Sequence, residues 1–227
     1  MANLKEVRNR IQSVISTQQI TKAMKMVAAA KLRRAQDAIT QMRPYAQRLN
    51  HVIGNVSASV GEDLSNPFAE VRPVNKVLVI LVTSDRGLCG AFNTNINKAV
   101  LTLLQDKYPT QLAAGNVTLL PIGKKGSEFF ARRGYKAHSE FVFTYSNLSF
   151  ATVSKAAEFA MDGFVKGDYD EVMLVFNEFK NVATQIVRSE QMLPLVASAD
   201  TVANKSNTEY IFEPSAEYIL ETVLPAS

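Results

Sequence analysis

Residues 3–60 form a long stretch almost free of helix breakers, and this stretch constrains the fold more than any other feature. It holds no glycine before Gly54 and one proline, Pro44. A helix over this range would be about 85 Å long at 1.5 Å per residue. Its apolar residues keep one heptad register over about eight heptads, at Leu4, Val7, Ile11, Val14, Ala28, Leu32, Ala35, Ile39, Met42, Ala46, Leu49, Ile53, Val56 and Val60. We therefore expect a coiled-coil helix that protrudes and packs on another surface, because average helices are far shorter.

The heptad register has one gap. Gln18, Thr21 and Lys25 occupy positions that should be apolar, while Ile20, Met24 and Val27 form a displaced apolar stripe. Two interpretations stay open. The supercoil changes locally, or another surface is contacted on a different face of the helix.

Positive charge is concentrated in the same stretch. Residues 1–50 carry ten basic and two acidic side chains, a local charge of +8, whereas the remainder carries 15 basic and 19 acidic ones. The partner of this helix should therefore be acidic, either nucleic acid or an acidic protein surface. Tyr45 is the one aromatic residue among the first fifty, which argues against base stacking.

From Asn75 onward the pattern changes to strands alternating with helices. Residues 76–83 form a continuous, β-branched apolar run, which is typical of a parallel strand buried on both faces. This pattern predicts an α/β fold with a doubly wound, mostly parallel five-stranded sheet, whose last strand is antiparallel at an edge. The strands are expected over 76–83, 117–122, 137–143, 171–176 and 183–193, and the helices over 93–107, 124–133 and 148–165. The expected domains are a shaft helix (1–60), a linker (61–75), the α/β domain (76–213) and the start of another helix (214–227).

The turn after the first strand is the place where α/β folds usually bind ligands. Residues 83–93 contain two glycines, Gly87 and Gly90, and match neither a dinucleotide fingerprint nor a Walker loop. Asp85, Arg86 and Cys89 could serve as acid, electrophile and thiolate, so an enzyme of small molecules remains an alternative. We favour a structural turn that caps the following helix. One cysteine and two distant histidines argue against a His/Cys metal site.

Two blocks of sequence resemble the signature of the F-type ATP synthase gamma subunit. They are residues 20–32 (ITKAMKMVAAAKL) in the long helix and residues 84–90 (SDRGLCG) after the first strand. The order of long helix, linker and α/β domain is also similar. Residues 43–45, 193–195 and 210–214 support the match, so the resemblance extends over the whole chain.

The resemblance implies a non-catalytic rotor subunit that transmits rotation from a membrane ring to the catalytic β subunits. Its partners would be the alpha and beta head subunits, the epsilon subunit and the membrane c-ring, with no nucleic acid and no cofactor. The implied location is the cytoplasmic face of the bacterial inner membrane, in a peripheral complex. The implied rotor–stator contact residues are Lys22, Met24, Lys25, Arg33, Arg34, Asp85, Arg86 and Cys89. The alternative is a basic coiled-coil protein that binds nucleic acid or serves as an adaptor.

The sequence departs from the family at its C-terminal end. Family members continue through a long C-terminal helix, whereas this sequence stops at Ser227. We expect either a truncated product or a fragment, in which the N-terminal apolar stripe lacks its intramolecular partner. The sequence has no inserted cysteine pair and no transit peptide, which favours a bacterial protein.

Overall fold

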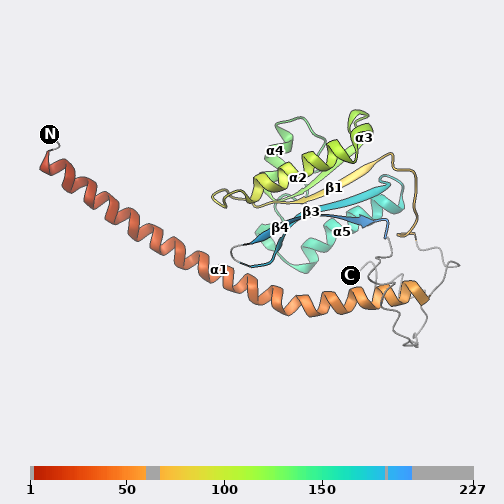
Figure 1. Cartoon of the computed structure of the whole chain (residues 1–227), viewed down its shortest axis with the longest axis horizontal. Helices are drawn as coiled ribbons and strands as arrows, with labels where there is room; N and C mark the ends of the chain where they lie inside the picture. Colours follow the sequence, from red (N-terminus) through yellow and green to blue (C-terminus); the bar gives the residue numbers. More distant parts are fainter. Residues whose placement is uncertain (1–2, 60–66, 182–183, 196–227) are drawn as a thin grey trace. The chain divides into compact units, whose positions relative to one another are not determined.

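The computed structural model describes residues 3–59, 67–181 and 184–195, which belong to two compact units. The described part of the first unit, up to Asn55, consists of one helix, α1 (Leu4–Ser59), coloured red to orange in Figure 1, whose last four residues are assigned to the second unit. The 56 residues of α1 continue through Pro44 without interruption. The predicted long helix is confirmed, while residues 61–66 of the predicted linker and the predicted helix start at 214–227 lie outside the described residues.

The second unit is built on a four-stranded sheet with the order β2-β1-β3-β4. The strands are β1 (Val77–Val82), β2 (Val117–Ile122), β3 (Glu171–Phe179) and β4 (Gln185–Leu193). Strand β1 pairs in parallel with β2 and β3, and β3 pairs antiparallel with β4 at the edge. The mostly parallel sheet and its antiparallel edge strand are therefore confirmed.

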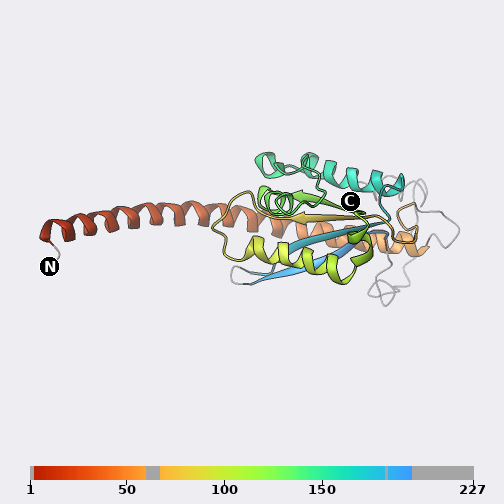
Figure 2. The same cartoon turned by 90° about the horizontal axis from the view of Figure 1, so that it is seen from above.

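Helices cover both faces of this sheet, as the doubly wound prediction requires. Helices α2 (Phe92–Asp106) and α4 (Lys124–Ala131) pack on one face, and α5 (Phe150–Val165) packs on the other (Figures 1 and 2). Two short elements were not predicted, namely α3 (Pro109–Ala113) and the 3-10 turn η1 (Thr144–Asn147).

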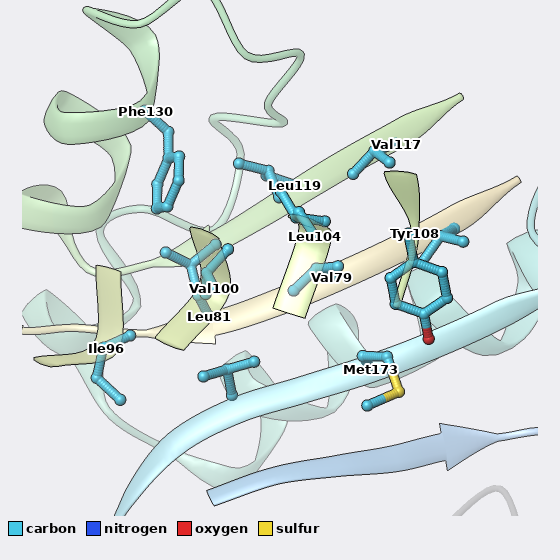
Figure 3. Packing of buried hydrophobic residues seen from close by; sticks show 12 residues of the cluster. Val79, Leu81, Ile96, Val100, Leu104, Tyr108, Val117, Leu119, Phe130 and Met173 are labelled. Carbon is cyan, nitrogen blue, oxygen red and sulfur yellow. The ribbon is translucent and has the colours of Figure 1, made fainter. Parts of the chain in front are cut away.

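The continuous apolar run of β1 is explained by burial on both faces. Val77, Val79 and Leu81 belong to the core beneath α2 and α4, while Leu78 and Ile80 belong to the core beneath α5. Figure 3 shows the first of these cores. There α2 contributes residues spaced by four, so that its buried stripe faces the sheet; they are Ile96, Val100 and Leu104.

The predicted strand over 137–143 is wrong. The described part of this segment makes only one isolated parallel bridge to β2, between Leu119 and Ala137. Beyond it the chain turns, and the buried side chains of Phe141 and Val142 reach the interior from this turn. Their apolar character therefore reflects burial of a turn, so the sheet has four strands within the described residues.

Candidate functional site

The basic face of α1 is the first candidate surface. Lys22, Lys25, Arg33 and Arg34 are all exposed, and none has a carboxylate within ion-pair distance among the described residues. Met24 is 60% exposed beside them. These cations are therefore free to attract an acidic partner, and their role as contact residues stays a prediction.

The gap in the heptad register is accommodated by the helix itself. The Thr21 hydroxyl donates a hydrogen bond to the Thr17 carbonyl at 2.8 Å, and the Thr17 hydroxyl donates to the Ser13 carbonyl at 2.9 Å. Ile20, Met24 and Val27 remain exposed on the displaced stripe. The hydroxyl group of Thr21 at the gap is thus satisfied within the helix, whereas the apolar side chains of the displaced stripe lack a cover within the described part of this unit.

The second candidate surface is the turn that follows β1. Its first residues cap the N-terminus of α4, where the first amides of a helix lack intrahelical partners. The backbone amide of Lys124 donates to Asp85 Oδ1 at 3.0 Å, and that of Lys125 donates to the Ser84 carbonyl at 3.0 Å. The buried amide of Gly126 donates to Thr83 Oγ1 at 2.8 Å. Three consecutive residues of the turn therefore satisfy the first three amides of α4.

This capping pattern corrects one detail of the sequence interpretation. The turn was expected to cap the helix that follows it, yet α2 has no side-chain cap at Ala91. The helix that it caps is α4, which begins about forty residues later in the chain. Asp85 is half-buried in this role, so its carboxylate has a structural function whether or not it also meets a partner.

The other end of the turn is fixed by Asn93, in the first turn of α2. Its side-chain oxygen accepts a hydrogen bond from the Ser84 amide at 2.9 Å, and its side-chain amide donates to Cys89 Sγ at 3.2 Å. The Ser84 hydroxyl also donates to the Arg86 carbonyl at 2.6 Å. Of the groups that an enzyme would use at this position, the Asp85 carboxylate and the Cys89 thiol thus take part in holding the turn, whereas the Arg86 side chain does not.

Between these anchors, the turn presents three side chains to solvent. Arg86 and Cys89 are exposed, and their role as contact residues stays a prediction. Leu88 was not singled out from the sequence. It is fully exposed, and its backbone has a φ of 62°, in the left-handed region that leucine rarely adopts. The signal that could have identified it is an apolar residue between two glycines in a polar turn.

Tyr145 of η1 lies close enough to this turn to respond to its charge. Burial raises the pKa of its hydroxyl, and the negative charge of Asp85 raises that pKa further. The predicted contact residues thus lie in both units: Asp85, Arg86 and Cys89 come together in this turn, while the other five lie along α1.

Comparison with known proteins identifies the family. A family model described as "ATP synthase" matches residues 3–227. The ATP synthase gamma chain of Cytophaga hutchinsonii is 51% identical over 229 residues, which cover 100% of this chain and 78% of that protein. This chain belongs to the ATP synthase gamma-chain family.

Other gamma chains give the same result. That of Flavobacterium psychrophilum is 48% identical, with 100% of this chain and 77% of that protein covered. The gamma chain of Chlorobaculum parvum is 45% identical, and the match covers 99% of this chain and 77% of that protein. Among solved structures, the central stalk and c-ring of the Tetrahymena thermophila mitochondrial ATP synthase contains a similar chain. That likeness has a TM-score of 0.53 at 27% identity and covers 91% of this chain and 86% of that one.

No helix in the described ranges combines the length and hydropathy of a membrane span. Likewise, the described residues contain no group of three His, Cys, Asp or Glu side chains that could hold a metal ion. A polar cleft of about 390 Å³ does occur on the sheet domain. In its lining, the Tyr169 hydroxyl oxygen lies 3.3 Å from His138 Nε2.

Proposed function

We propose that this gamma chain is a rotor subunit of the ATP synthase central stalk and transmits rotation from the membrane c-ring to the catalytic β subunits. The observation that carries the proposal is the match to gamma chains over the full length of the chain, at up to 51% identity. The likeness to a solved central stalk supports it. These comparisons favour the rotor over a nucleic-acid-binding coiled coil.

In this proposal residues 1–60 form the shaft and residues 76–213 form a separate α/β domain. The 56 residues of α1 give a shaft about 84 Å long at 1.5 Å per residue. Its free cations at Lys22, Lys25, Arg33 and Arg34 would face acidic surfaces of the head. Exposed charges attract over about 10 Å without fixing one geometry, so they hold a rotating shaft without locking it at one angle.

We further propose that the chain is non-catalytic and that synthesis takes place on the β subunits. Support comes from the turn after β1, where Asp85, Ser84 and Asn93 are committed to hydrogen bonds that hold the fold. The alpha, beta and epsilon subunits and the c-ring are the proposed partners. Because the relatives come from bacteria such as Cytophaga and Flavobacterium, we place the complex at the cytoplasmic face of the inner membrane.

Assembly with the head subunits tests this function. The chain would be mixed with alpha and beta subunits of the Cytophaga hutchinsonii enzyme, both as it stands and fused to the C-terminal part of that organism's gamma chain. We expect a specific complex, and ATP hydrolysis by the complex that contains the fused form. If the fused form neither assembles nor supports hydrolysis, the proposed function is wrong.

A further inference from the structure

The polar cleft of the α/β domain lies at the amino ends of the parallel strands. Lys76 directly precedes β1, Asn116 directly precedes β2, and Asp168 and Tyr169 come shortly before β3. Parallel strands start at the same edge of their sheet, so these residues meet there although they are far apart in sequence. The cleft is therefore at the opposite edge of the sheet from the turn after β1.

Buried hydroxyl groups form part of the cleft wall. Thr118 and Tyr169 line it and are only 4% and 9% exposed. Burial raises the pKa of the Tyr169 hydroxyl, and the charge of Asp168 raises it further, while a hydrogen bond from Thr118 opposes both effects. Tyr169 therefore keeps its proton at neutral pH, and its hydroxyl can donate either to His138 Nε2 at 3.3 Å or to a ligand.

Two lysines give the cleft positive charge. Lys76 Nζ donates to the Gly167 carbonyl at 3.4 Å, near the long limit of a hydrogen bond, and Lys136 is exposed. Within residues 3–59, 67–181 and 184–195, neither ammonium group has a carboxylate at ion-pair distance. The neighbouring Asp170 carboxylate is occupied by the backbone amides of residues 75 and 76, at 2.9 and 2.8 Å. Two lysines against the single carboxylate of Asp168 leave the lining with a net positive charge, which favours an anion.

Asp168 narrows the class of anion. Its carboxylate is exposed in the cleft and has no ion-pair partner in the described part of the chain. An ionised carboxylate only accepts hydrogen bonds, so it favours an anion that carries a proton to donate. A phosphate group with a P–OH proton meets this requirement, because its second pKa is about 6. Sulfate has no such proton at neutral pH.

We propose that this cleft binds a phosphate group that carries a P–OH proton, either as inorganic phosphate or as a phosphate monoester. The ammonium groups of Lys76 and Lys136 pair with its charged oxygens, and the Tyr169 hydroxyl donates to one of them. Asp168 accepts the hydrogen bond of the P–OH group and thereby disfavours sulfate. This site goes beyond the proposed rotor function and does not depend on it.

Isothermal titration of the full chain at about pH 6 tests the site, because roughly half of a phosphate monoester keeps its P–OH proton there. Inorganic phosphate or glycerol phosphate should bind about tenfold or more tightly than sulfate, and the tighter of the two identifies the source of the phosphate group. Lys136→Gln should weaken this binding by about tenfold, because a charge-assisted hydrogen bond is lost. The matched control is Lys98→Gln, which removes an exposed lysine of α2 on the other face of the sheet and should leave binding unchanged.

Asp168→Asn tests the choice between phosphate and sulfate. The variant removes the negative charge and should bind sulfate more tightly than the unchanged chain, so that the preference for phosphate is lost. Imidazole resonances give a second measurement, since the chain has only two histidines, His51 and His138. Phosphate should shift the resonance of His138 and leave that of His51 in place, and His51→Gln assigns the two.

Four results would overturn the site. The first is equal affinity of the unchanged chain for phosphate and sulfate, and the second is an unaltered preference in Asp168→Asn. The third is equal weakening by Lys136→Gln and Lys98→Gln, which would indicate non-specific attraction. The fourth is the absence of both heat and a His138 shift at millimolar phosphate. Because Lys136 and Asp168 are exposed, their variants should melt like the unchanged chain, so that unfolding does not account for a loss of binding.

Discussion

Replacement of Asp85 separates its structural role from a role in contact. Its carboxylate accepts a hydrogen bond from the first amide of α4 at 3.0 Å. Loss of such a cap typically costs about 1 kcal/mol, and loss of a negative charge at a helix N-terminus costs about 0.3–1 kcal/mol more. Asp85→Ala should therefore lower the free energy of unfolding of the α/β domain by about 1–2 kcal/mol. Asp85→Asn keeps the acceptor and should lose only the charge contribution, about 0.3–1 kcal/mol.

The assay is urea denaturation followed by the near-ultraviolet signal of tyrosine, which three buried or half-buried tyrosines of this domain supply, namely Tyr108, Tyr135 and Tyr169. In a parallel thermal melt, a loss of 1–2 kcal/mol should lower the melting temperature by about 3–8 °C in a domain of this size. The matched control is Arg86→Ala, since Arg86 is exposed and caps nothing in the described structure. Equal stability of Asp85→Ala and the unchanged chain would refute the capping role.

The same variants also test contact with the head. If Asp85 only positions the turn, Asp85→Asn should bind the alpha–beta head as the unchanged chain does. The pKa of Tyr145 offers a second measurement, because the charge of Asp85 contributes to raising it. That pKa should fall in Asp85→Asn, which would confirm that the two groups are neighbours in solution.

Three further predictions concern packing, pH and charge. Gly123→Ala should destabilise the domain by about 4 kcal/mol or more. An added Cβ would lie 2.0 Å from the Thr83 carbonyl oxygen, and the φ of Gly123 is 104°. Thermal melting measures this loss, and a variant as stable as the unchanged chain would contradict the prediction. Burial, and then Glu171, raises the pKa of the Tyr108 hydroxyl above its usual 10.0. Above that pH the unfolded chain loses a proton that the folded chain keeps, so stability should fall by up to about 1.4 kcal/mol per pH unit for this group; Tyr108→Phe should reduce the slope in urea titrations between pH 9 and 11.5. Lys25→Glu should impair coupled ATP hydrolysis more than assembly in the reconstituted complex, and equal loss of both would contradict a role in rotation.

Most of the fold could be predicted from local patterns. The run of β-branched residues at 76–83 indicated a buried parallel strand, and β1 is buried on both faces as expected. The long heptad pattern indicated α1. The prediction of a strand over 137–143 was wrong because the apolar side chains of Phe141 and Val142 are buried although they lie in a turn. A run of apolar residues indicates that a segment is buried, but over a few residues it does not distinguish a strand from a turn.

The candidate site was predicted less completely, for a physical reason. The contacts that shape the turn after β1 join residues distant in sequence: Thr83 and Gly126 are 43 positions apart, and Asp85 and Lys124 are 39 apart. Adjacent parallel strands bring their carboxyl ends together, so a turn after β1 meets the helix that follows β2. Nothing in the local sequence of residues 83–85 identifies α4 as the helix to be capped. Exposure of Leu88 is likewise a result of the assembled turn.

The two surfaces of this gamma chain differ in physical character, and the difference bears on how a rotor holds its stator. The cations of α1 lie on long exposed side chains, so their attraction is screened by salt and tolerates changes of angle. The turn after β1 is different, because hydrogen bonds fix both of its ends and present Leu88 in one conformation. A surface fixed in this way favours one relative orientation of its partner, whereas exposed cations on long side chains attract a partner over many orientations.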